Sequence, residues 1–149
     1  MIAVPLTAFA ILLIGLAVLA AADVATERVE WAPTILLAVL TVSALAVDGI
    51  SLQQWVWGSL TAAAAFLFYL EMGVQGRFGG GDITLAPIPG LVLGAMNPLV
   101  GVWAFAVMLS VQGLLSVVAR LKFKTAETRL PHVPAMFAGA IACLFMGFL

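Results

Sequence analysis

Three long stretches of the sequence contain no charged residue, and they constrain the fold more than any other feature. They cover residues 2–22, 52–70 and 99–119. Because a bilayer core about 30 Å thick is crossed by about 20 helical residues, each stretch is long enough to span a membrane as a helix. Hydrophobic residues make up 64% of the chain and charged residues only 9%, too few to solvate the surface of a soluble domain. The sequence therefore predicts a polytopic membrane protein and excludes a soluble globular enzyme, a disordered chain and a DNA-binding module.

Three shorter apolar runs, over residues 32–47, 83–95 and 133–149, complete the pattern. The run over 83–95 contains two prolines, which disfavour a regular helix. We therefore expect an all-α bundle of six transmembrane helices in a single domain, residues 1–149, with a short or irregular fourth helix. The first run is expected to be a retained helix rather than a cleaved signal peptide, because no Lys or Arg precedes Arg28.

The basic residues predict the orientation of this bundle. If consecutive helices alternate in direction, the connections 23–31, 71–82 and 120–132 lie on one side of the membrane. These connections contain every Lys and Arg of the chain: Arg28, Arg77, Arg120, Lys122, Lys124 and Arg129. The opposite connections, 48–51 and 96–98, contain none. The positive-inside rule then predicts that the basic side is cytoplasmic and that both termini are external. With a net charge of −1, no nucleic-acid partner is expected.

Two carboxylates on the basic side stand at the ends of predicted spans. Asp23 ends the first span, where it either stops the span or, as an ionisable group near membrane depth, is a functional candidate. Asp82 closes the string Gly79-Gly80-Gly81-Asp82, where the simpler interpretation is a helix N-cap. The three glycines, followed by Pro87 and Pro89, favour irregular backbone instead, which at membrane depth lines a cavity or is buried in protein.

The other ionisable side chains have simpler interpretations. Asp48 is expected to be a turn residue, and His132 to have an interfacial or capping role at the start of the last span. Cys143 cannot form a disulfide within the chain, because it is the only cysteine. No phosphate-binding loop and no cluster of metal ligands is visible in the sequence, so we expect neither a metal nor a cofactor. The remaining loop carboxylates are expected to be solvated: Glu27, Glu30 and Glu127.

Asp23 and Asp82 are more informative as a pair. They belong to different helices on the same side, and a compact bundle could bring them together. Two carboxylates that share one proton are the catalytic apparatus of an aspartic protease, in which one group acts as base and the other as acid. The alternative is a membrane subunit or small transporter without catalytic activity, in which the same two residues handle protons or cations. A third interpretation is a purely structural assembly partner.

Three segments of the chain resemble the type IV prepilin peptidases, which are membrane aspartic proteases with a GxGD motif. Residues 23–29 resemble the segment around the family's first catalytic aspartate, and Gly79-Gly80-Gly81-Asp82 matches the GxGD motif. Residues 131–139 resemble the Pro-rich start of the family's last helix. The chain has neither the length nor the cysteines of the larger members that also methylate the pilin, and it is similar to the short peptidases that serve Flp-type (Tad) pili.

This resemblance implies a function, a site and a location. Asp23 and Asp82 would be catalytic, in a multi-pass protein of the bacterial inner membrane with its active site facing the cytoplasm. The substrate would be a prepilin-like protein with a basic leader, a glycine before the cut and an apolar helix after it. Gly79, Gly80 and Gly81 would hold the scissile backbone. Lys122 and Lys124 would either contact an acidic part of the substrate or anchor the loop at the lipid surface.

Overall fold

The computed structural model describes residues 4–26, 28–123 and 130–145, and all regular structure among them is helical. This confirms the expected all-α fold. Seven helices follow one another along the chain: α1 (Leu6–Thr26), α2 (Trp31–Val47), α3 (Leu52–Val74), α4 (Gly80–Leu85), α5 (Pro87–Met96), α6 (Pro98–Phe123) and α7 (Val133–Phe145).

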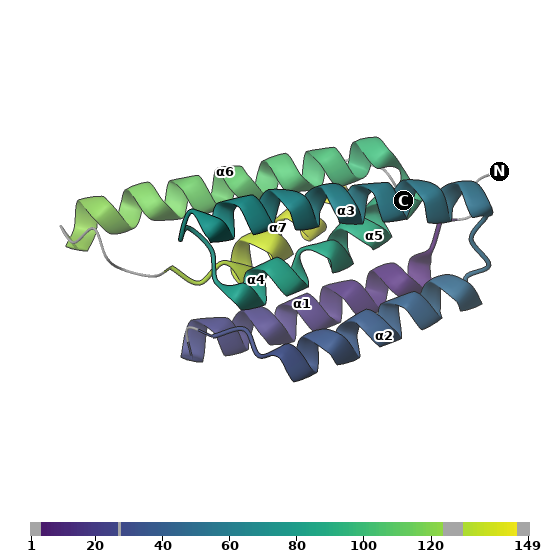
Figure 1. Ribbon diagram of the computed structural model, residues 1–149, viewed down its shortest axis with the longest axis horizontal. Helices are drawn as coiled ribbons and strands as arrows, with labels where there is room; N and C mark the ends of the chain where they lie inside the picture. Colours follow the sequence, from purple (N-terminus) through teal and green to yellow (C-terminus); the bar gives the residue numbers. More distant parts are fainter. Residues whose placement is uncertain (1–3, 27, 124–129, 146–149) are drawn as a thin grey trace.

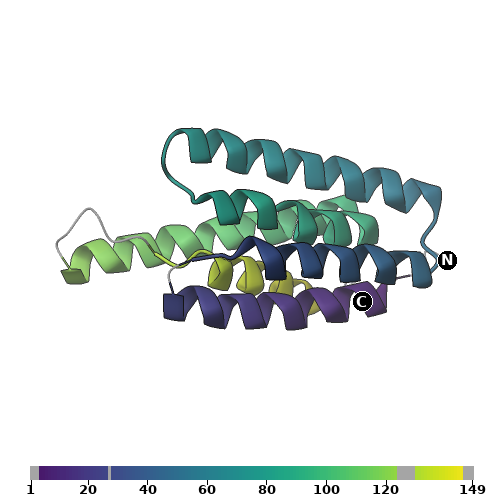
Figure 2. The ribbon, with the colours of Figure 1, turned by 60° about the horizontal axis from the view of Figure 1, so that its bottom comes forward.

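The helices lie side by side along the long axis of the molecule and alternate in direction (Figures 1 and 2). The connections α1–α2 and α3–α4, together with the end of α6, therefore meet at one end of the bundle. The connections α2–α3 and α5–α6 meet at the opposite end. This arrangement gathers Arg28 and Arg77 at the same end, as the alternation of basic and uncharged connections in the sequence predicts.

The predicted fourth helix consists of the two short helices α4 and α5, which only Ala86 separates. Pro87 is the first residue of α5. Proline is well tolerated at this position because its missing N–H has no partner to lose in the first turn, but it ends the hydrogen bonding of the preceding helix. Taken as one broken segment, Gly80–Met96, the pair confirms a bundle of six helices with an irregular fourth.

Several helices extend beyond the apolar runs that predicted them. The helix α1 continues past residue 22 to Thr26, α3 continues past Glu71 to Val74, and α6 continues past residue 119 to Phe123. The third span, expected over the apolar run 52–70, is therefore predicted to end too early. Charge marks where a span leaves the apolar layer, whereas a helix ends only where its backbone turns, as at Gly76 with φ of 73°.

The end of the bundle opposite the basic connections has well-defined caps. Ser51 and Gln54 form a capping box at the start of α3, with the Gln54 N–H donating to Ser51 Oγ and the Ser51 N–H donating to Gln54 Oε1. Asp48 and Gly49 form the expected turn after α2. Asp48 Oδ2 also accepts the N–H of Ala8 at 3.0 Å, so this turn residue caps the first turn of α1 as well.

The helix α5 lies at the centre of the bundle, with seven of its ten residues buried, and it packs most extensively against α3. Glycines make this approach close. A Cβ built on Gly58 would lie 2.6 Å from the carbonyl oxygen of Leu91, and one built on Gly90 would lie 3.0 Å from Cα of Ala62. Gly90 and Gly94 form a GxxxG pair, the spacing that lets membrane helices approach backbone to backbone.

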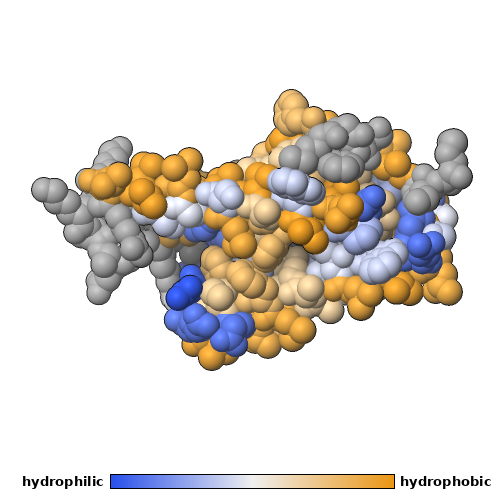
Figure 3. All heavy atoms as spheres, turned by 90° about the horizontal axis from the view of Figure 1, so that it is seen from above, coloured by the Kyte–Doolittle hydropathy of each residue, from blue (hydrophilic) through white to orange (hydrophobic). Residues whose placement is uncertain are grey.

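The outer surface of the bundle is apolar over most of its length. Three helices are long and apolar enough to cross a membrane, namely α1, α3 and residues 98–119 of α6. Their outward side chains include Ile14, Leu67 and Val102, each more than 60% exposed. Figure 3 shows orange apolar residues over much of the surface, with hydrophilic residues mainly toward the two ends. Because exposed apolar surface of this extent needs an apolar surrounding, the chain is a membrane protein.

One glycine fixes where α4 lies against the rest of the bundle. A Cβ built on Gly81 would lie 2.5 Å from the carbonyl oxygen of Val29 and 2.6 Å from its Cβ, so α4 touches the backbone between α1 and α2. A Cβ built on Gly80 would meet nothing within 4 Å. The two neighbouring glycines therefore differ in what they require, although the sequence does not distinguish them.

We predict that Gly81→Ala destabilises the protein and that Gly80→Ala does not. The added methyl at position 81 forces the backbones of α4 and Val29 apart, at a cost of about 1–3 kcal/mol. At position 80 it meets open space and favours the helix. Thermal unfolding of the two purified variants in detergent measures the difference. Equal unfolding temperatures for Gly81→Ala and the wild type would contradict this packing.

Candidate active site

Asp23 is a buried carboxylate that joins the first helix to the last. It lies one turn before the end of α1, and its side chain is 4% exposed. Its Oδ2 accepts the backbone N–H of His132 at 2.8 Å and that of Val133 at 3.0 Å. These N–H groups stand at the N-terminus of α7, where the helix dipole favours a negative charge. The carboxylate is thus held in one orientation by backbone donors from the other end of the chain.

Asp82 approaches from a different part of the bundle. It is the third residue of α4 and is partly buried. Its Oδ2 accepts the N–H of Gly79 at 3.1 Å, and Gly79, with an extended backbone, is the N-cap residue of α4. The N-cap interpretation of Asp82 is therefore wrong in position, since the carboxylate reaches back from the first turn. The expectation of irregular backbone is also wrong for Gly80 and Gly81, which are helical.

Both aspartates line one cavity of about 1140 Å³ at the basic end of the bundle. Its walls come from the end of α1 and the α1–α2 connection, from the second half of α3, the α3–α4 connection and α4, from the second half of α6, and from the residues just before α7. Ionisable and polar side chains are therefore concentrated in one space beside the membrane-spanning part of the bundle. The charged and polar side chains lining it are Asp23, Arg28, Arg77, Asp82, Gln112, Ser116 and His132.

His132 is part of this cavity wall rather than an interfacial residue. Its side chain is only 2% exposed, so the expected interfacial role is wrong, and the capping of α7 comes from Asp23. The imidazole Nε2 shares a hydrogen bond with the hydroxyl of Tyr69, and the ring packs against Phe78 at a centroid distance of 4.5 Å. Burial lowers the pKa of His132 to about 4, so the ring is neutral at neutral pH.

Tyr69 and Phe78 belong to the same buried cluster. The two rings are stacked with centroids 4.8 Å apart, and the Tyr69 side chain is fully buried on α3. Neither residue was a candidate from the sequence. A lone tyrosine in an apolar run carries no signal of its own, and only the fold places it beneath the aspartate cavity.

The predicted binding residues fall into two groups. Gly79, Gly80 and Gly81 all line the cavity beside Asp82. Lys122 lies in the last turn of α6, and Lys124 lies outside the described residues, so their role stays a prediction. Among the described residues, no three His, Cys, Asp or Glu side chains gather closely enough to hold a metal ion.

This arrangement can support proton exchange with a bound water. Two carboxyl groups face one space that is large enough for an extended peptide segment as well as water. One carboxylate can take a proton from the water while the other, protonated, gives one to a carbonyl oxygen. The neutral His132 and the backbone-held Asp23 keep one wall of this space fixed.

Comparison with known proteins assigns the family. A sequence model of the type IV leader peptidase family matches residues 10–149, which covers nearly the whole chain and both aspartates. No curated protein and no solved structure matches the chain. A match of this extent indicates a peptidase that acts on prepilin-like proteins in general. The chain belongs to the type IV leader peptidase family.

Proposed function

We propose that this chain is an aspartic endopeptidase that removes the basic leader from prepilin-like proteins at the cytoplasmic face of the bacterial inner membrane. The observation that carries the proposal is that Asp23 and Asp82, 59 positions apart in the sequence, line the same cavity. The family match covers both residues and supports peptide hydrolysis as the reaction.

The mechanism follows from two carboxyl groups that share a proton. A water held between them loses a proton to the ionised carboxylate and attacks the scissile carbonyl carbon. The protonated carboxyl gives its proton to the carbonyl oxygen, which forms a tetrahedral diol without a covalent enzyme intermediate. The newly protonated carboxyl then gives its proton to the leaving nitrogen. As the C–N bond breaks, the other carboxylate takes a proton from a diol hydroxyl, so the new carboxyl terminus forms and the pair returns to its singly protonated state.

The backbone hydrogen bonds of the two aspartates would keep both carboxyl groups in a fixed orientation during this cycle. Asp23 is held by two N–H donors at the start of α7, and Asp82 by the N–H of Gly79. Each contact engages Oδ2, and both residues face the cavity. Binding of the scissile segment along Gly79, Gly80 and Gly81 would place its carbonyl next to Asp82, because no side chain separates the two backbones.

The cytoplasmic location is part of the same proposal. The aspartate cavity lies at the end of the bundle where the connections carrying Arg28 and Arg77 meet. Under the positive-inside rule this end faces the cytoplasm, where a basic leader is also found. The resemblance of the chain to the short peptidases that serve Flp-type (Tad) pili supports an Flp-type prepilin as the substrate.

We expect Asp23→Asn and Asp82→Asn each to lower leader cleavage at least ~100-fold, since an amide can neither take nor give the proton. Both variants should fold, because an amide oxygen can still accept the backbone N–H groups. The double variant should be no worse than either single one, since the groups act as a unit. Cleavage of a leader-bearing substrate by purified protein measures these rates.

Control variants show whether the loss of cleavage is specific to the two aspartates or follows from removing any carboxylate of the chain. Glu30→Gln and Asp48→Asn remove carboxylates elsewhere and should cleave within a few-fold of the wild type. Near-normal cleavage by a folded Asp82→Asn protein would refute the aspartic mechanism. Failure of the wild type to cleave, with proton or cation flux that depends on Asp23, would favour the transporter alternative.

Reporter fusions test the orientation. Reporters placed after residue 75 or residue 125 should read cytoplasmic, and a reporter at the C-terminus should read external, because all six basic residues lie in or beside alternate connections. A fusion after Gly49 serves as an internal control for the external side. A cytoplasmic signal at residue 149 is incompatible with six spans in this orientation.

Neutralising Lys122 and Lys124 together tests whether the loop after α6 binds substrate. If these side chains contact an acidic part of the substrate, Lys122→Gln with Lys124→Gln should raise KM more than it lowers kcat. Steady-state kinetics at two salt concentrations measure the effect, which should shrink as salt screens the contact. Unchanged kinetics would assign both lysines to anchoring at the lipid surface.

A further inference from the structure

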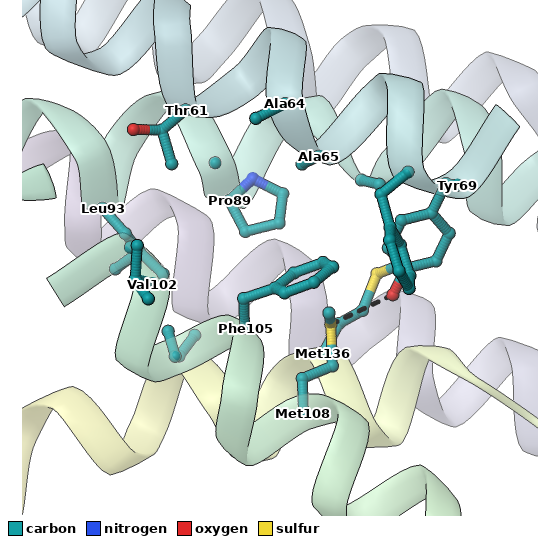
Figure 4. A pocket seen from close by; sticks show the side chains of 16 residues that line it. Thr61, Ala64, Ala65, Tyr69, Pro89, Leu93, Val102, Phe105, Met108 and Met136 are labelled. Atoms are coloured by element: carbon teal, nitrogen blue, oxygen red, sulfur yellow. Dashed lines mark hydrogen bonds between the residues drawn. The ribbon is translucent and has the colours of Figure 1, made fainter. Parts of the chain in front are cut away.

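A second cavity lies between α3 and α6, away from the aspartates. It has a volume of about 310 Å³, and α5 and α7 form its floor. Figure 4 shows side chains from these four helices around it, with the ring of Phe105 extending from α6 toward α3. We call this cavity the apolar groove. It is lined by Thr61, Ala64, Ala65, Phe68, Tyr69, Ala86, Pro89, Gly90, Leu93, Gly101, Val102, Ala104, Phe105, Met108, Met136 and Ala140.

The apolar groove opens on the side of the bundle rather than at its ends. Ala64 on α3 and Val102 on α6 both line it and both lie on the exposed surface, Val102 being 63% exposed. The helices α3 and α6 contact each other much less than each contacts α5. Since both are candidate membrane spans, the mouth of the groove faces lipid.

The lining of the groove excludes a polar or extended occupant. Its two hydroxyl groups are already engaged, that of Thr61 with the Trp57 carbonyl and that of Tyr69 with Met108 Sδ and His132. An extended backbone or a charged side chain placed there would find no hydrogen-bond partner, which is costly at membrane depth. A helix satisfies its own backbone, and a small exposed residue in the lining, Ala64, allows a helix to approach closely.

The groove adjoins the aspartate cavity. Phe68 lines both spaces. Its ring packs edge-to-face on Phe105 in the groove, with centroids 5.0 Å apart. Next to it, Tyr69 lines the groove while its hydroxyl is bonded to His132 in the cavity wall. Phe68 therefore marks the boundary between the two spaces, and a chain bound at the aspartates would have to pass it to enter the groove.

We propose that the apolar groove receives the first turns of the substrate's apolar helix, the part that follows the cut. This inference rests on the proposed function, because it takes the substrate to be a prepilin-like protein. The groove extends along residues 61–69 of α3, about 12 Å at 1.5 Å per residue, which matches about two turns of a helix lying alongside. A cavity of about 150 Å³ holds one benzene, so this groove takes about two side chains of leucine or phenylalanine size.

Adjacent alanines on α3 provide the test. Ala64 lines the groove, whereas Ala63 is exposed on the same turn and lies outside the lining. Ala64→Leu and Ala63→Leu add the same side chain at nearly the same depth, and Ala64 is exposed, so neither change overpacks the core. Two substrates are compared: a full-length prepilin-like protein in detergent, and a peptide that ends a few residues after the cut.

We expect Ala64→Leu to lower the ratio of kcat/KM for the full-length substrate to that for the peptide about tenfold, mainly through KM. Ala63→Leu should leave this ratio within twofold of the wild type. Equal ratios for the two variants, or an equal loss on both substrates with Ala64→Leu, would overturn the inference. If the wild type cleaves neither substrate, the proposed function itself fails, and the two failures are therefore distinguishable.

Photo-crosslinking identifies the occupant directly. A photoreactive phenylalanine analogue at Val102 should crosslink to the first two turns of the substrate helix, using the inactive Asp82→Asn protein to trap the complex. The same analogue at Trp103, which is also exposed but outside the groove lining, should crosslink much less. Crosslinks from Val102 that join two copies of this chain, or only lipid, would overturn the assignment.

Discussion

The carboxylate of Asp23 at the N-terminus of α7 is the interaction on which the rest of the molecule depends. It joins residues 109 and 110 positions apart, so it closes the bundle by tying the first helix to the last. The backbone N–H groups that it accepts would otherwise be unpaired in the first turn of a buried helix. Because this contact also forms one wall of the aspartate cavity, the bond that closes the fold fixes one half of the site. At the opposite end of the bundle, Asp48 makes a similar contact, because its carboxylate accepts the backbone N–H of Ala8 in the first turn of α1.

Asp82, the second carboxylate of the site, is positioned by glycines, whose lack of a side chain lets neighbouring helices come close. Gly81 allows α4 to lie directly on the backbone of Val29, and Gly90 and Gly94 allow α5 to lie directly on α3. In lipid, where apolar contacts between helices gain little over contacts with acyl chains, such close packing replaces the hydrophobic driving force. Asp82 therefore reaches the cavity that Asp23 also lines through a series of close backbone contacts that larger residues would break. This explains why a glycine-rich motif accompanies the second carboxylate.

Much of this architecture could be predicted from the sequence, and the failures have physical reasons. Apolar runs and the distribution of basic residues predict six spans with an irregular fourth, because a membrane imposes both signals directly on the sequence. Helix ends were predicted less well, since α3 continues past Glu71 where the chain leaves the apolar layer but its backbone does not yet turn. The sequence predicts Asp82 as the N-cap of the fourth helix, whereas the N-cap is Gly79 and Asp82 is the third helical residue. The sequence does not separate the two positions, because an aspartate can cap a helix from either one. The burial of His132 could not be predicted at all, since its partners Tyr69 and Phe78 come from distant segments.

The contrast between the two cavities defines what kind of chain can be processed at this site. The aspartate cavity offers carboxylates, arginines and backbone donors, whereas the groove beyond Phe68 offers almost only apolar contacts. On the proposed function, a substrate that extends from the aspartate cavity into the groove would change near Phe68 from an extended backbone to a helix whose backbone hydrogen bonds are internal. On the proposed mechanism, hydrolysis at the aspartates would need the extended form, because a helical carbonyl is already bonded within its own helix and is shielded from attack. On the proposed function, the junction at Phe68 would thus select a substrate by the point at which its helix begins, so that the position of the cut follows from conformation as well as from sequence.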